Sequence, residues 1–195
     1  MTTRKTILAV SALVLATAPA VVNASGVVPY HRMAAADLAP DGYAHHPVLR
    51  IDQDFHPNDN YEISIDAWVS EGEPDSLAAV RMWWLDTSDA NARSPFGKGV
   101  RRHIDIDYKE RGSGWDIRIK QGRKKAYVFA VDLKDGKTTA TASVRTKTGD
   151  IDDCQLTGSR LVAKKVLGIA TGLKRIDVTC LDAEGAEHRG SVITR

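Results

Sequence analysis

The chain has 195 residues, of which 43% are hydrophobic, with 27 Lys and Arg against 25 Asp and Glu and only two Cys. Removing the predicted leader also removes Arg4 and Lys5, which leaves 25 basic residues against 25 acidic ones. The mature chain is therefore close to neutral, and nucleic acid is not an expected partner. About 170 mature residues are enough to bury a hydrophobic core in a single domain.

Residues 1–24 have the features of a secretory signal peptide. Two basic residues are followed by an apolar run from Thr6 to Ala18, and small residues suited to cleavage end at Ala24, with Ala20 as the alternative site. The apolar run is too short to cross a bilayer comfortably, and no later segment approaches that length. We expect a soluble mature protein in the periplasm or secreted, with an uncleaved anchor as the alternative.

Residues 25–47 are rich in Ala, Pro, Asp and His and show no sustained period, which predicts an extended N-terminal arm before a single β domain over residues 48–195. Imidazole groups can bind copper or zinc in an extracytoplasmic compartment. The spacing of the histidines matches no closed metal site, so an exposed polar arm is favoured and a weak metal site is the alternative; no cofactor is expected. The candidate ligands are His31, His45, His46 and His56.

Strand patterns dominate the next part of the chain. Apolar and polar residues alternate over Tyr61–Val69, which is typical of a β-strand. The segment Ser76–Asp86 fits either a short helix or a strand, and its β-branched and aromatic residues favour the strand. Thr87–Gly99 is a polar loop that is long for a hairpin connection, which makes it a candidate functional loop.

The middle of the chain reads as an antiparallel meander. Four strand-like runs follow one another at short spacing, and Asp135-Gly136 between the last two is the strongest hairpin signal in the sequence. The segment 155–167 has both helical and strand character, and alternation resumes over Leu173–Leu181. These patterns predict a mainly β protein: a single antiparallel β-sandwich or partly open barrel of about seven to nine short strands, with room for one short helix.

Cys154 and Cys180 are the two cysteines of a chain that begins with a secretory leader. In an oxidising compartment such a pair usually forms a disulfide, so we expect the bond Cys154–Cys180. The alternative, a nucleophilic Cys154, would require a free thiolate with a histidine partner and is disfavoured.

A basic segment is the most usable surface in the sequence. Five cations at a predicted hairpin could attract an anionic polymer or an acidic protein partner, although lysines also protect exposed strand edges from aggregation. A second group, Lys164-Lys165 and Lys174-Arg175, flanks an apolar loop, and proximity of the two groups would favour binding. The five candidate contact residues are Arg118, Lys120, Arg123, Lys124 and Lys125.

Trp83 and Trp84 are further candidate contact residues. Adjacent residues on a strand point to opposite faces, so at least one of them should face outward or into a second layer. Packing in the core is favoured, and exposure for partner docking is the alternative.

Two carboxylate pairs, Asp52/Asp54 and Asp105/Asp107, each lie on one face of a predicted strand. Paired carboxylates can hydrolyse glycosides, but acids on the solvent side of a half-buried strand give the same pattern. No motif of a serine hydrolase, zinc protease, phosphate loop or dinucleotide site occurs. The sequence therefore favours an exported, non-catalytic binding protein, with an envelope hydrolase or a periplasmic metal-binding protein as alternatives.

Overall fold

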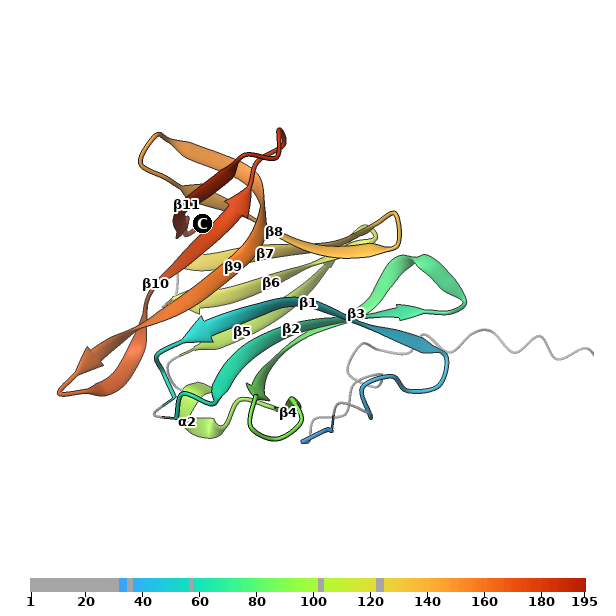
Figure 1. Ribbon diagram of the computed structural model, residues 1–195, viewed down its shortest axis with the longest axis horizontal. Helices are drawn as coiled ribbons and strands as arrows, with labels where there is room; N and C mark the ends of the chain where they lie inside the picture. The colour runs from blue at the N-terminus through green and yellow to red at the C-terminus, as the bar shows by residue number, and fades with distance from the viewer. Residues whose placement is uncertain (1–31, 35–36, 57, 102–103, 122–124) are drawn as a thin grey trace, which may run out of the picture.

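The computed structural model describes residues 32–34, 37–56, 58–101, 104–121 and 125–195. Strands make up most of this part of the chain (Figure 1). Eleven strands lie within these residues: β1 (Tyr43–Gln53), β2 (Tyr61–Ser70), β3 (Glu73–Asp86), β4 (Ala92–Ser94), β5 (Asp105–Arg111), β6 (Gly114–Gln121), β7 (Lys125–Lys134), β8 (Lys137–Arg145), β9 (Asp150–Val166), β10 (Ile169–Leu181) and β11 (Glu187–Val192).

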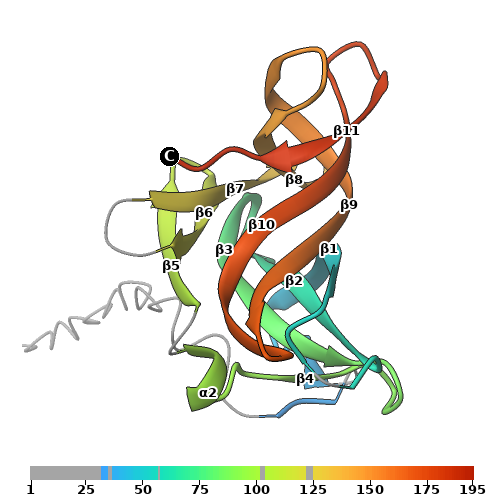
Figure 2. The same ribbon diagram turned by 90° about the vertical axis from the view of Figure 1, so that its left-hand side faces the viewer.

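All eleven strands belong to one sheet with the order β4-β3-β2-β1-β9-β10-β11-β8-β7-β6-β5. The mainly β prediction is confirmed, but the prediction of about seven to nine strands in a sandwich is wrong. The reason is β9, whose 17 residues pair with β8 in their first part and in parallel with β1 over Ser159–Leu161. One long strand therefore joins two halves that would otherwise form separate sheets (Figures 1 and 2).

The segments with mixed patterns are strands. Residues 76–86 lie in β3, as favoured, and residues 155–166 lie in β9. The predicted polar loop after β3 contains the short strand β4 and leads to the four-residue helical turn α2 (Lys98–Arg101). Within the described part of the chain, no helix has the length and hydrophobicity that crossing a bilayer requires.

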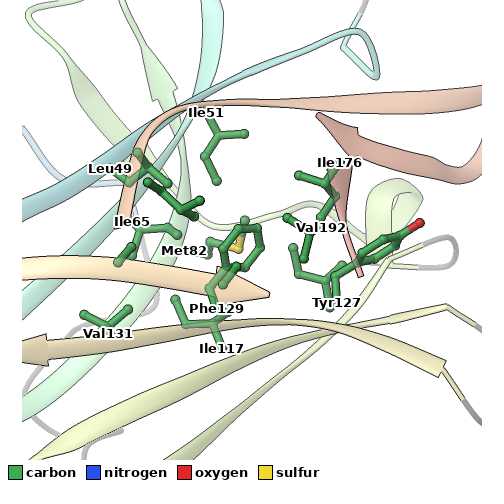
Figure 3. Close-up of a cluster of buried hydrophobic side chains, with 14 of the residues drawn as sticks. Leu49, Ile51, Ile65, Met82, Ile117, Tyr127, Phe129, Val131, Ile176 and Val192 are labelled. Atoms are coloured by element: carbon green, nitrogen blue, oxygen red, sulfur yellow. The ribbon is translucent and has the colours of Figure 1, made fainter. Parts of the chain in front are cut away.

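The sheet curves so that its two halves enclose one hydrophobic core. Figure 3 shows aliphatic and aromatic side chains from both halves packed together, and all of those labelled are buried: Leu49, Ile51, Ile65, Met82, Ile117, Tyr127, Phe129, Val131, Ile176 and Val192. Hydrogen bonds also join the halves, since the indole Nε1 of Trp115 donates to the carbonyl oxygen of Leu77 at 2.9 Å. Packing of the core therefore determines how strongly the sheet curves, which the strand pattern of the sequence does not specify.

The N-terminal segment covers the outer face of β2 and β3. Met33 and Leu38 pack there against Trp68 and Trp83, and the Trp68 Nε1 donates to the Leu38 carbonyl oxygen at 2.6 Å. The arm expected over residues 25–47 ends earlier than predicted, because residues 43–47 already belong to β1. In its described part the arm is a packing layer for a second, smaller apolar cluster.

The predicted disulfide Cys154–Cys180 is confirmed. It joins the neighbouring strands β9 and β10, and both cysteines are completely buried in the main core. The bond lies next to a register shift between Thr179 and Cys180, where the ladder of backbone pairs is interrupted. It therefore ties the two strands together at a point where their backbone pairing is irregular.

Gly190 permits the close approach of β11 to β8. A Cβ atom at this position would overlap the carbonyl oxygen of Arg145 and lie 2.7 Å from Val144 Cγ1. We expect Gly190→Ala to lower the free energy of unfolding by about 1–3 kcal/mol, because the closely packed backbones of β11 and β8 must move apart. Urea denaturation followed by circular dichroism measures this change.

Gly158→Ala is the matched control in β9. Its Cβ would meet only Thr179 Cβ at an ordinary 3.8 Å, so the free energy of unfolding should stay the same or rise by up to about 1 kcal/mol. Equal destabilisation by both substitutions would contradict the role assigned to Gly190.

Candidate binding surface

The described cations of the β6–β7 hairpin differ in their surroundings. Arg118 and Lys125 are exposed, and no acidic partner for them occurs among the described residues. Lys120 lies between two acids, with its Nζ 2.5 Å from Asp107 Oδ2 and 3.4 Å from Asp105 Oδ2. The hydrogen bond to Asp107 raises the pKa of Lys120. The Lys120 ammonium group therefore stays protonated, and the neighbouring carboxylates balance its positive charge. The candidates Arg123 and Lys124 lie outside the described residues.

The β9–β10 hairpin carries the second basic group around an apolar end. Val166, Leu167 and Ile169 are the exposed large hydrophobic residues of the described chain. Lys164 and Lys165 precede them and are also exposed. Farther along β10, Arg175 pairs with Asp177 at 2.8 Å, whereas neighbouring Lys174 is exposed and has no ion pair within the described ranges.

One hydrogen bond links the β6–β7 hairpin to the β9–β10 hairpin. The hydroxyl of Tyr127, two residues after Lys125, donates a hydrogen bond to the Lys174 carbonyl oxygen at 3.3 Å. Burial raises the pKa of Tyr127, so the phenol remains protonated and able to donate. The Tyr127 side chain therefore links the start of β7 to the outer part of β10, although β11 and β8 stand between these strands in the sheet order. We call the surface formed by Lys125, Lys164, Lys165 and Lys174 the basic end.

Trp83 and Trp84 point to opposite faces of β3, as expected, but neither is exposed. Trp84 lies in the main core and makes an edge contact with Phe96, with 5.0 Å between ring centroids. Trp83 lies in the outer cluster beneath the N-terminal segment. The alternative of an exposed docking tryptophan is therefore wrong for both residues. Trp83 is covered by a segment that is distant in sequence, and the position of that segment cannot be read from the strand pattern.

Both carboxylate pairs are held in ion pairs. Asp105 and Asp107 share Lys120, as described above. Asp52 Oδ2 lies 3.1 Å from Arg160 Nη1, and Asp54 accepts a hydrogen bond from the backbone N–H of Ala163 at 2.5 Å. A glycosidase needs two carboxyl groups that face one substrate across a cleft. These acids instead stabilise cations of neighbouring strands.

A cleft beside the Asp105/Asp107 pair is small. It has a volume of about 140 Å³ and contains Asp105 but not Asp107. Its walls come from α2 and the segment leading into β5, and its lining residues are Phe96, Arg101, Ile104, Asp105, Ile106 and Tyr108. The geometry at this cleft gives a single carboxylate, without the second one that the hydrolase hypothesis requires.

The candidate metal ligands do not converge. His45 Nε2 lies 3.2 Å from Asp66 Oδ1, while the ring of His56 packs in a tilted arrangement against Tyr61 with 4.2 Å between centroids. His46 follows His45 on β1 and therefore projects from the other face of the strand. His31 lies outside the described residues. Within the described ranges, no three His, Cys, Asp or Glu side chains are placed to hold a metal ion.

A buried charge cluster at Asp66 was missed by the sequence analysis. The Asp66 side chain is fully buried and accepts hydrogen bonds from Arg93 Nε at 3.1 Å and from the Ser64 hydroxyl at 2.9 Å. Burial by itself would raise the pKa of Asp66, but hydrogen bonds from His45 and Arg93 and the Arg93 charge hold it below its usual value. Asp66 occupies the outer face of β2, so no sequence signal marked it as buried.

A groove of about 700 Å³ lies on the outer face of β9, β10 and β11. Its lining includes the small residues Gly158, Ser159, Gly190 and Ser191 and the cations Arg145, Lys147, Arg160 and Arg189. Arg145 pairs with Asp150 at 3.0 Å, and Arg160 pairs with Asp52. Charge in this groove is therefore largely compensated within the sheet, unlike the charge at the basic end.

Comparison of the chain with protein-family models, with curated proteins and with solved structures finds no match. The lysines of the basic end are exposed, and three of the four have no acidic partner among the described residues; the exposed apolar residues Val166, Leu167 and Ile169 lie next to them in the β9–β10 hairpin.

Proposed function

We propose that the protein is an exported, non-catalytic binding protein of the bacterial envelope or periplasm that contacts an anionic partner through the basic end. The observation that carries this proposal is the Tyr127–Lys174 hydrogen bond, which links the start of β7, where Lys125 is exposed, to the β9–β10 hairpin that carries the other three lysines. Clustered cations raise the local concentration of an anionic partner and speed its association.

The balance of charges supports this surface over the others. Lys125, Lys164 and Lys174 have no acidic partner in the described part of the chain, and Lys165 has only Asp54 at 3.7 Å. Exposed cations without intramolecular partners lose no ion pair when they bind an anion. By contrast, Arg145 and Arg160 of the outer groove would have to exchange existing partners.

The disulfide supports export. Disulfide bonds persist in the periplasm and in secreted proteins, and they are rare in reducing compartments. The completely buried Cys154–Cys180 bond agrees with the leader expected over residues 1–24. We therefore assign the protein to the periplasm or the secreted fraction.

Charge reversal at the basic end tests the proposal. The variant Lys125→Glu/Lys174→Glu should elute from a heparin column at markedly lower salt than the wild type, because a sulfated polymer loses two cationic contacts and meets two anions. Affinity for soluble heparin should fall about tenfold or more, as measured by fluorescence titration.

The matched control is Lys134→Glu/Lys137→Glu at the β7–β8 turn, where both lysines are exposed. It has the same change in net charge at the opposite end of β7 and should shift elution much less. Equal shifts for the two double variants would show attraction by overall charge alone and would overturn the assignment of the basic end.

A further inference from the structure

The end of the β9–β10 hairpin exposes three large aliphatic side chains at one point. Val166 is 53% exposed, Leu167 98% and Ile169 70%. Val166 and Ile169 pair directly across the turn, so the three side chains extend from a single tip. Figure 1 shows this hairpin projecting beyond the body of the molecule. Exposed aliphatic residues usually occur singly, whereas a cluster indicates an interaction site.

The fold gives no reason for a leucine at position 167. Its φ of 51° is followed by 80° at Gly168, the pair of positive angles that a type I′ turn requires. Asn, Asp and Gly adopt this conformation most readily, and leucine is disfavoured there. Since Leu167 is almost fully exposed, burial within the protein does not compensate for the disfavoured backbone conformation. Contact of the Leu167 side chain with an apolar phase outside the molecule would compensate for it.

Lysines flank the tip on both strands, and the surrounding sequence contains no acidic residue. Lys164 and Lys165 precede it on β9, Lys174 follows on β10, and no acidic residue occurs from Leu161 to Ile176. An apolar tip with a basic collar matches segments that lie in the interface of anionic membranes, where lysines contact headgroups and aliphatic groups enter the acyl boundary.

We propose that this hairpin tip inserts Val166, Leu167 and Ile169 into the interface of an anionic phospholipid bilayer. The inference rests on the proposed function, because lysines of the basic end supply the attraction to the headgroups. A convex tip of three side chains offers much less area than a stable protein interface buries, whereas a bilayer accepts such a tip directly.

The pairing of the strands limits insertion to the interface. β1 pairs with β9 only as far as Leu161, and β11 pairs with β10 only from Asp177. In the described part of the chain no third strand pairs with the hairpin beyond these points. The Ala163 N–H still donates to Asp54 and the Lys174 carbonyl oxygen accepts from Tyr127, but the backbone groups nearer the tip have no neighbouring strand. Such groups are strongly disfavoured in the hydrocarbon core, so the hairpin stops at headgroup depth while its tip enters the acyl boundary.

The test uses the full mature chain and vesicles of phosphatidylcholine with and without phosphatidylglycerol. The wild type should float with phosphatidylglycerol vesicles and remain unbound with phosphatidylcholine alone. Leu167→Asn should reduce partitioning about tenfold or more, because the most exposed aliphatic group is lost without a change in charge. Asn-Gly is a preferred type I′ sequence, so this variant should fold as well as the wild type or better.

A second variant reports insertion directly. In Leu167→Trp, addition of phosphatidylglycerol vesicles should shift the emission to the blue and protect the new indole from acrylamide. The native Trp68, Trp83, Trp84 and Trp115 are buried and provide a constant background.

The outcomes separate this inference from the proposed function. Heparin binding by the wild type without vesicle binding overturns insertion and leaves the anionic-partner proposal intact. Unchanged vesicle binding by Leu167→Asn shows attraction by charge alone and overturns insertion. A Leu167-dependent dimer in sedimentation, without vesicle binding, assigns the tip to a second copy of the chain and overturns it also. Loss of vesicle binding by Leu167→Asn with heparin retention unchanged supports it.

Discussion

Replacing Arg93 by methionine is expected to lower the free energy of unfolding by about 3–5 kcal/mol, because the carboxylate of Asp66 would remain buried without its cationic partner. Arg93 is only 6% exposed and donates to Asp66 through both Nε and Nη2, at 3.1 and 3.3 Å. Urea denaturation followed by tryptophan fluorescence measures the loss, since Trp68 and Trp83 lie on the same face of the sheet.

The double variant Asp66→Asn/Arg93→Met is the control. It removes both charges together, so it should recover about 1–3 kcal/mol relative to Arg93→Met alone. A double variant as unstable as the single one would show that Arg93 acts through packing and not through the charge of Asp66.

The same cluster predicts a dependence of stability on pH. The pKa of Asp66 is lowered in the folded protein, so the associated stabilisation is present above the unfolded value of about 4 and is lost as the pH falls through the depressed folded value. Arg93→Met removes the Arg93 hydrogen bonds and charge and leaves the His45 hydrogen bond, so the pKa of Asp66 should rise relative to the wild type because burial is less fully offset. The destabilisation should be greatest near pH 7 and shrink towards about pH 3. Equal losses at both pH values would contradict this account.

The double variant Cys154→Ala/Cys180→Ala is expected to lose roughly 3–4 kcal/mol of unfolding free energy, because removing the bond frees a loop with a sequence separation of 26 in the unfolded chain. Guanidinium denaturation of the oxidised wild type and of the double variant measures the difference. The loss should be large relative to a typical domain stability of about 5–15 kcal/mol.

Reduction of the wild type supplies the comparison for this variant. Denaturation in the presence of dithiothreitol should give nearly the same midpoint as the double variant, because both states lack the cross-link. A decrease below about 1 kcal/mol in either experiment would show that the pairing of β9 with β10 holds the loop without the disulfide.

Individual strands were predictable where the pattern is local. The alternation over Tyr61–Val69 corresponds to β2, and the turn at Asp135-Gly136 has the expected positive φ angles of 50° and 71°. Both signals depend on residues adjacent in the chain, because side chains alternate along a strand and only certain residues accept a left-handed backbone.

The candidate surface was predictable only in part. The basic groups around Lys125 and Lys174 were recognisable as charge clusters, but their proximity depends on the Tyr127 contact across the fold. The neutralisation of Lys120 by Asp105 and Asp107 depends on the register between β5 and β6. A sequence read in order does not specify which charges face each other across strands.

Local patterns are enough to predict a disulfide-linked β protein with an apolar, lysine-flanked segment in residues 164–175. That the strands form one sheet, that Trp83 and Asp66 are covered, and that the apolar segment forms an exposed tip follows only from the folded structure. The difference lies in the range of the interactions. Alternation and turn conformation arise between neighbouring residues, whereas strand pairing and burial arise between residues such as Ile51 and Ser159 that only the completed fold brings together.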